Sequence, residues 1–503
     1  MGIKTIIINL MTNIFDDPTH DHTADYEKVE QEYLAAPYNP DVDIFIFLLF
    51  SGKDKKNALK MRQLKKGAGK FEFEDGTFNS EFDFGDPDNL KVLFSELNEM
   101  GNYTNRILVT WDHGYGYLMF KNEITRSDKF LWESLFNQDW FKKLWATYGT
   151  VVETINPGTP GYSNTGVMDK SGIKDNGHKI NEANDQPLTE AWKTFAGKLI
   201  FSTKMSSPVY LDADYPVRFN PIFTAKQLTA LTINELADGI ERSSIKKFDL
   251  IVMSNCYMQN IDTTYALQNC CNYLIAPQTT FPWESYDFGA LVPQKSERID
   301  DAFCKTVLAK TQRSLELKIT PNNSDVTLDE IGFSCIKTDQ CNAFFKELKK
   351  ITDFLSAYYS TLDKDIYFAA NQICDLTNPK RETAGVVVNL DQIDLTFFLE
   401  FLNSRWSKYT DFSIPYSQVK KMLDNNSLIL ENRKGDLFYW DASSPVPKKA
   451  CKGISIFFPK NKTSYENSTY AEVFIDDGVQ TQTKFSKDFG WGLFLEEFFG
   501  QYN

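Results

Sequence analysis

Two residues whose types suit nucleophilic catalysis stand at the ends of predicted strands. Cys256 closely follows an apolar run at residues 248–253, and His113 closely follows another at 106–110. A cysteine thiol becomes a nucleophile when a neighbouring histidine takes its proton, so this pair of side chains favours attack on a carbonyl carbon. The two residues lie far apart along the chain, and only the fold can bring them together.

Each residue also has a structural interpretation when it is taken alone. A lone cysteine after a buried strand is usually a core thiol, and a lone histidine before a glycine is usually a loop residue. Catalysis is favoured because both residues follow strands of one predicted sheet, and ligands of open α/β sheets bind outside the carboxyl ends of the strands. A helix expected from residue 257 would place unpaired N–H groups beside Cys256, which favours the thiolate.

Short apolar runs predict the sheet that must position these residues. Runs that are apolar on both faces are typical of parallel strands covered on both sides, and they span residues 5–10, 43–50, 106–110, 248–253 and 273–276. Helical patterns lie between them, at residues 89–100 with Asp88 as N-cap and Gly101 as stop, at 228–243 and at 257–271. The alternation predicts an α/β fold with an open, mostly parallel sheet flanked by helices.

The chain is predicted to divide near residue 295. Residues 1–295 would form the catalytic domain, with a long insert over about 117–225 that contains a Gly-, Pro- and Asn-rich surface loop. Residues 296–503 would form a C-terminal α+β region packed on it. The patterns there predict helices at 296–313 and 341–361 and strands at 326–336, 385–389, 437–440 and 453–459.

Composition and charge exclude several classes of function. The 503-residue chain has a net charge of −14, which disfavours nucleic acid and anionic membranes as partners. No apolar run reaches 18 residues, so no membrane span is expected. The eight cysteines show no paired spacing, which favours buried free thiols. The sequence also lacks the GxSxG, HExxH, Walker and GxGxxG patterns.

Several longer segments resemble one peptidase family. They are GDPDNL at residues 85–90, RILVTWDHGYG at 106–116, FDLIVMSNCYMQNIDTTYAL at 248–267, YLIAPQTTFPWESYDFGAL at 273–291, GISIFFP at 453–459 and GWGLFL at 490–495. Together they look like the histidine box, the nucleophile box and the closing motifs of the clostripain (C11) cysteine peptidases. The resemblance covers most of the chain and implies a caspase-like fold and hydrolysis of peptide bonds.

The resemblance also implies roles for single residues. Cys256 would be the nucleophile of a cysteine endopeptidase, and His113 would be its general base and later the acid for the leaving amine. The N–H groups of Gly114 and Cys256 would form the oxyanion hole. No third catalytic residue is evident beside Cys256 and His113, because Asp112 would face away from His113 if the strand continues. Substrates would be proteins or peptides.

Departures from the family pattern predict an altered preference before the cut. Family members usually cleave after Arg or Lys and carry acidic residues where this chain has Ser254, Gln278 and Thr279. A cationic side chain would lose its charged partner in such a pocket, so strict Arg/Lys specificity is not expected. Phe281 and Trp283 either line a pocket for a larger, uncharged side chain or pack in the core.

Other interpretations remain open at this point. A catalytically inactive caspase-like binding or scaffold protein is one alternative, and another thiol hydrolase on the same fold is a second. No cofactor or metal is expected, although a calcium ion could be bound by the acidic segment at residues 16–22. No signal peptide is visible, which favours a cytoplasmic location, while the resemblance implies that export is possible.

Overall fold

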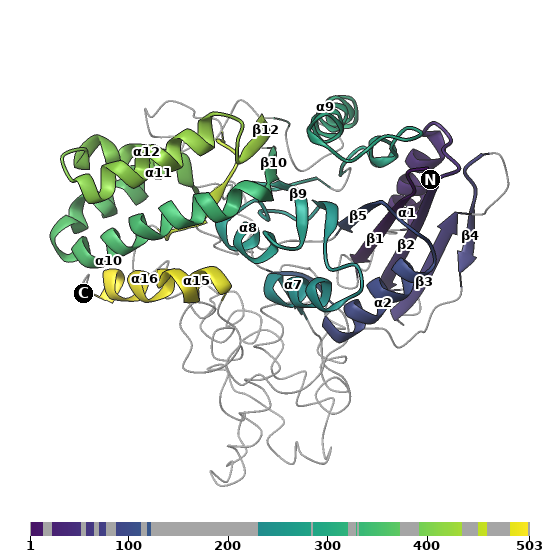
Figure 1. Cartoon of the computed structure of the whole chain (residues 1–503), viewed down its shortest axis with the longest axis horizontal. Helices are drawn as coiled ribbons and strands as arrows, with labels where there is room; N and C mark the ends of the chain where they lie inside the picture. Colours follow the sequence, from purple (N-terminus) through teal and green to yellow (C-terminus); the bar gives the residue numbers. More distant parts are fainter. Residues whose placement is uncertain are drawn as a thin grey trace, which may run out of the picture.

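A mostly parallel sheet of nine strands crosses the described part of the chain (Figure 1). The computed structural model of the protein describes residues 2–13, 23–51, 57–64, 70–76, 87–111, 118–121, 230–282, 285–319, 328, 331–372, 392–434, 451–459 and 483–500. In spatial order the strands are β12 (Ile429–Lys434), β10 (Gly332–Lys337), β9 (Cys271–Pro277), β8 (Phe248–Met253), β5 (Asn105–Trp111), β1 (Thr5–Asn13), β2 (Val42–Ser51), β3 (Asn57–Leu64) and β4 (Phe73–Gly76). This arrangement confirms the predicted mixed α/β fold.

The five strands in the middle of the sheet are parallel, and the two strands at each edge are antiparallel to their neighbours. β2, β1, β5, β8 and β9 pair in parallel, as their apolar sequences require. β3 and β4 extend one edge, and β10 and β12 extend the other. The carboxyl ends of β5 and β8 therefore lie side by side at one edge of the sheet.

Helices cover both faces of the sheet because the strands are apolar on both sides. Ile6, Ile8 and Leu10 of β1 face one core cluster, while Ile7 and Met11 face the other. The first face is covered by α2 (Pro87–Glu99), α7 (Ile233–Arg242) and α8 (Ile261–Leu267). The second face is covered by α1 (Thr23–Ala35), η2 (Phe288–Leu291) and α9 (Asp301–Lys318).

The region after residue 296 shares the sheet with the first half of the chain. β10 pairs with β9 and β12 pairs with β10, so the sheet crosses the predicted domain boundary. α9 of this region covers the second face of the sheet, while most of its other helices form a helical lobe, seen at the left of Figure 1. It contains α10 (Cys341–Gln372), α11 (Leu395–Trp406), α12 (Thr410–Asp424) and α16 (Trp491–Gly500), with a small sheet of β11 (Gln392–Asp394) and β13 (Ser455–Phe457).

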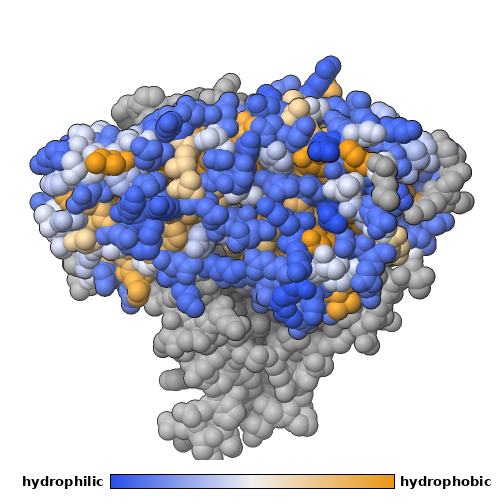
Figure 2. All heavy atoms as spheres, in the orientation of Figure 1, coloured by the Kyte–Doolittle hydropathy of each residue, from blue (hydrophilic) through white to orange (hydrophobic). Residues whose placement is uncertain are grey.

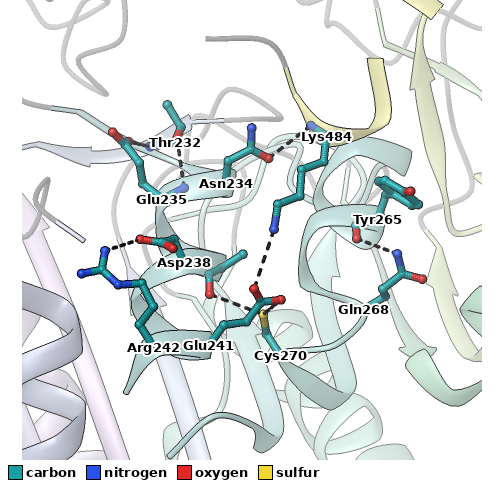
Figure 3. A network of polar contacts seen from close by, with 11 residues as sticks. Thr232, Asn234, Glu235, Asp238, Glu241, Arg242, Tyr265, Gln268, Cys270 and Lys484 are labelled. Atoms are coloured by element: carbon teal, nitrogen blue, oxygen red, sulfur yellow. Dashed lines mark hydrogen bonds and ion pairs between the residues drawn. The ribbon is translucent and has the colours of Figure 1, made fainter. Parts of the chain in front are cut away.

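The C-terminal helices return to the first half of the chain. α15 (Lys484–Phe489) packs on α8, and the backbone N–H of Lys484 donates to Oδ1 of Asn234 at 3.3 Å. In Figure 3 this contact lies beside the first turn of α7, where Thr232 and Glu235 form a capping box. Lys484 Nζ also lies 4.0 Å from the carboxylate of Glu241. These polar contacts fix the C-terminal segment next to the helices that flank β8.

Several predicted boundaries differ from the structure. The helix expected at 228–243 is shorter, because Ala230–Thr232 form strand β7, which pairs with β6 (Leu118–Lys121), and Thr232 caps α7. Asp88 is not an N-cap, since α2 already begins at Pro87, a residue that suits the first helical position. Asp88 lies in the first turn and pairs with Arg242. The strands predicted at 385–389 and 437–440 lie outside the described residues.

The visible surface is mainly hydrophilic. Figure 2 shows hydrophobic side chains as small separate spots on this face. Among the helices of the described residues, none combines the length and apolar character that a membrane crossing requires. The large apolar side chains are instead concentrated in the two core clusters on either side of the sheet.

Candidate active site

Cys256 lies in a turn directly after β8, at the carboxyl end of the parallel strands. Its thiol is partly exposed, whereas the other six cysteines of the described residues are buried. The backbone N–H of Phe281 donates to Sγ of Cys256 at 3.2 Å. A donor within hydrogen-bond distance of sulfur stabilises negative charge on it. The neutral thiol can also donate to the carbonyl oxygen of Phe281, 3.6 Å from Sγ. Cys256 thus combines a partly exposed position with a backbone donor to its sulfur.

Four of the other thiols lie in surroundings that keep them neutral. Burial raises the pKa of Cys270 and of Cys341 to about 12. Burial likewise raises the pKa of Cys271 and of Cys335 well above the ordinary value. These four thiols therefore stay protonated at neutral pH and are poor nucleophiles.

The turn that carries Cys256 is hydrogen-bonded to the chain that follows β9. The N–H of Tyr257 donates to the carbonyl of Thr279 at 3.0 Å, and the N–H of Gln259 donates to the carbonyl of Pro277 at 2.8 Å. The hydroxyl groups of Tyr257 and Thr280 are 2.6 Å apart. Tyr257 has a positive φ of 62°, which an L-residue adopts only when its surroundings require it. These contacts hold the turn firmly against the sheet.

The helix predicted to start at residue 257 begins later than expected. α8 spans only Ile261–Leu267, and Asn260 is its N-cap, accepting a hydrogen bond from the N–H of Thr263 at 2.9 Å. The side-chain amide of Asn260 also donates to the carbonyl of Tyr257, which stabilises the turn in place of a first helical turn. Cys256 is therefore not at a helix N-terminus, and its donor comes from Phe281 instead.

The end of β5 is bonded to the residues just before Cys256. The N–H of Ser254 donates to the carbonyl of Thr110 at 2.7 Å. The hydroxyl of Thr110 donates to Oδ1 of Asn255 at 2.6 Å, and both side chains are fully buried. The predicted base His113 and the predicted oxyanion donor Gly114 lie outside the described residues.

The predicted substrate-binding residues have varied surroundings. The Ser254 hydroxyl is buried and hydrogen-bonded to the hydroxyl of Ser285. The ring of Phe281 lies 4.6 Å from that of Tyr286, centroid to centroid, within the core cluster on the α9 side of the sheet. Trp283 lies outside the described residues. A contact between substrate and these side chains stays a prediction.

Gln278 and Thr279 use their side chains in contacts within the protein. The amide of Gln278 donates to Oδ2 of Asp394 at 2.9 Å, and its oxygen accepts from the N–H of Gly453 at 2.8 Å. The hydroxyl of Thr279 accepts from the N–H of Gly332 at 2.8 Å. Both side chains are buried, so any role in substrate preference stays a prediction.

Asp394 is a buried acid that was not among the predicted site residues. It caps α11 by accepting from the N–H of Phe397 at 3.0 Å, and it also accepts from the N–H of Lys452 at 2.7 Å. Burial raises the pKa of Asp394 to about 6, although its hydrogen bonds act in the opposite direction. An aspartate just before a helical pattern is a usual N-cap signal, but the pattern does not reveal its partner Gln278.

The described residues lack a set of side chains that could bind a metal ion together. They contain no group of three or more His, Cys, Asp or Glu side chains placed to bind an ion. The acidic segment at residues 16–22, which was the candidate for calcium, lies outside the described residues.

The family comparison matches more than half of the chain. A family model described as the clostripain family covers residues 212–498. No curated protein matches the chain. Among solved structures, a secreted C11 cysteine protease from Bacteroides thetaiotaomicron with an irreversible peptide inhibitor gives a TM-score of 0.51 at 13% identity, covering 97% of this chain and 99% of that one. An inactive zymogen C11 protease from Parabacteroides distasonis gives a TM-score of 0.49 at 13% identity, and the match covers 92% of this chain and 93% of that one.

Proposed function

The chain belongs to the clostripain family of cysteine peptidases, and on this basis we propose that it is an endopeptidase in which Cys256 and His113 form the catalytic dyad. The main support for the dyad comes from the hydrogen bonds that join the end of β5 to the residues just before Cys256. His113 follows Trp111, the last residue of β5, by two positions. The chain thus enters the segment that contains His113 from a strand end that is bonded to the residues just before Cys256.

In the proposed reaction, His113 takes the thiol proton and Sγ of Cys256 attacks the peptide carbonyl carbon. His113 then gives the proton to the leaving amine as the C–N bond breaks, which leaves a thioester on Cys256. Water, deprotonated by His113, hydrolyses the thioester and restores the thiol. The N–H groups of Gly114 and Cys256 are proposed to bind the oxyanion, which needs preorganised donors.

We further propose that the peptidase does not require Arg or Lys before the cut. Ser254, two residues before the nucleophile, presents a neutral hydroxyl to Ser285 where relatives commonly have an acid. A lysine or arginine that enters a neutral site loses its water without gaining an ion pair, and this desolvation is costly. The Phe281 backbone next to Cys256 places an aromatic residue close to the nucleophile.

The direct test is a digest of a diverse peptide library under reducing conditions, with the products read by mass spectrometry. We expect internal cuts with the wild-type protein and none with Cys256→Ser. The residues before the cuts should include uncharged side chains. Cuts that persist in Cys256→Ser would overturn the proposed nucleophile. Cuts confined to Arg and Lys would overturn the proposed specificity, and no cuts in either protein would favour a binding role.

The Thr110–Asn255 hydrogen bond should be needed for efficient catalysis. Thr110→Val keeps the shape of the side chain but removes the donor to Asn255, beside the nucleophile. Removing one partner of a buried hydrogen bond costs about 1–3 kcal/mol, so kcat/KM should fall roughly tenfold, while Thr110→Ser should stay near wild type. Steady-state kinetics on a peptide from the library would measure both variants.

A second buried threonine supplies the matched control. Thr338 donates to the carbonyl of Cys271 at the opposite end of β9, away from Cys256. Thr338→Val should lower the melting temperature but leave kcat/KM unchanged. Equal kinetic losses in the two valine variants would show that Thr110 matters only for stability.

A further inference from the structure

A buried glutamine joins the catalytic edge of the sheet to the C-terminal region. Gln278 is the first residue after β9, and its amide donates to Asp394, which ends β11 and begins α11. Its oxygen accepts from the N–H of Gly453, which adopts a positive φ of 101° that favours glycine. Both Gln278 and Asp394 are fully buried. One side chain thus connects three segments that are far apart in the sequence.

The backbone next to Gln278 holds the turn that carries the nucleophile. The carbonyls of its two neighbours, Pro277 and Thr279, accept the N–H groups of Gln259 and Tyr257. These two donors lie on the chain just after Cys256. A shift of residue 278 would therefore move both acceptors and, with them, the sulfur of Cys256 relative to the sheet.

The C-terminal region also contacts the turn without passing through Gln278. The N–H of Ser455 in β13 donates to the carbonyl of Gln259 at 3.1 Å, and its hydroxyl donates to the same oxygen at 3.2 Å. Residues 451–459 therefore approach the turn directly, at Gln259, and indirectly, at Gln278. These two independent contacts fix both the position and the orientation of the turn that carries Cys256.

Asp394 is suited to hold Gln278 in one orientation. Its carboxylate accepts three N–H donors, from Gln278, Lys452 and Phe397. An amide can lie in two orientations, but only one places its NH₂ group toward this carboxylate and its oxygen toward the N–H of Gly453. The carboxylate therefore selects the orientation that completes both hydrogen bonds of Gln278.

We propose that Gln278 and Asp394 are positioning residues through which the C-terminal region sets the place of Cys256 in the active site. The inference depends on the proposed role of Cys256 as the nucleophile. Gln278 and Asp394 are not catalytic residues, since they act on the turn and not on the substrate. Loss of the contact should slow the chemical step and leave peptide binding nearly unchanged.

The test compares two buried glutamines replaced by methionine, which is similar in length but has no amide. Gln392, in β11, is also fully buried, and its amide has no hydrogen-bond partner in the described part of the chain. We expect Gln278→Met to lower kcat by at least tenfold with KM within threefold of wild type. Gln392→Met should keep wild-type kcat and KM.

Two further readouts separate positioning from a general loss of stability. The rate at which iodoacetamide alkylates Cys256 in the folded protein, at a temperature well below unfolding, should change in Gln278→Met but not in Gln392→Met. Asp394→Ala removes the acceptor of all three donors, the Gln278 amide included, so kcat should fall here too. This second variant keeps the test valid if Gln278→Met does not fold.

The results can separate the positioning role of Gln278 and Asp394 from the role of Cys256 as the nucleophile. Full activity in Cys256→Ser would remove the proposed nucleophile, whatever the glutamine variants do. A Cys256-dependent activity that keeps wild-type kcat in both Gln278→Met and Asp394→Ala would overturn the positioning role alone. A drop in kcat that is equal in Gln278→Met and Gln392→Met would overturn it as well.

Discussion

Cys256→Ala is expected to lower kcat/KM for peptide hydrolysis by at least about four orders of magnitude, as is found when a covalent nucleophile is removed. The reason is chemical, because alanine cannot form the thioester and no other described thiol can replace it. The buried thiols of Cys270, Cys271, Cys335 and Cys341 are held neutral by burial, which raises their pKa values. Progress curves on a fluorogenic peptide, with active-site titration of the wild type, would measure the loss.

A buried cysteine and the dyad partner provide the controls. Cys341→Ala, in the first turn of α10, should retain wild-type kcat/KM because that thiol is buried away from the turn of Cys256. His113→Ala should lose nearly as much activity as Cys256→Ala, and the double variant should lose no more than either single variant, since a nucleophile and its base act as one unit. Additive losses in the double variant would contradict the dyad.

Phe458→Ala is expected to lower the free energy of unfolding by about 3–5 kcal/mol, the usual cost of removing a large buried ring. Phe458 is fully buried and follows β13 at the centre of the helical lobe. Its ring lies within 5.2–6.3 Å, centroid to centroid, of the rings of Phe398, Trp491, Phe494, Phe498 and Phe499. Urea unfolding followed by tryptophan fluorescence would measure the change, since Trp491 is one of these neighbours.

An exposed residue on α16, the helix that carries four of these neighbouring rings, serves as the control for this measurement. Leu493 of α16 is 59% exposed, so Leu493→Ala should change stability by no more than about 0.5 kcal/mol. A loss below about 1 kcal/mol in Phe458→Ala would mean that the aromatic cluster can close over the cavity. It would also show that residues 451–459 are less firmly fixed than their contacts indicate.

The parallel strands could be predicted from the sequence because their pattern has a direct physical cause. A strand covered on both faces must be apolar at most of its positions, and β8 lies at the predicted residues, 248–253. The same logic placed Cys256 at the carboxyl end of that strand. Strand β3, which lies between β2 and the edge strand β4, was not predicted, because its sequence NALKMRQL mixes charged and apolar residues without a clear alternation.

Contacts that depend on distant residues could not be predicted. The turn after Cys256 replaces a helical start because its N–H groups bond to Pro277 and Thr279, about twenty residues later in the sequence. From its position in the sequence after the nucleophile, Gln278 was predicted to contact the substrate. Its partner Asp394 is more than a hundred residues away, and no local pattern connects the two.

The antiparallel strands beside β9 have a consequence for how the chain folds during synthesis. β9 ends at Pro277, and its outer side is paired only when β10, which ends at Lys337, has been made. At about 5–20 residues per second, the ribosome needs roughly 3 to 12 s to pass from one point to the other. For that time the apolar strand CNYLIAP presents free N–H and C=O groups to other chains, as it would permanently in a fragment cut at residue 295. We therefore expect such fragments to aggregate and the growing chain to need chaperone protection over this interval.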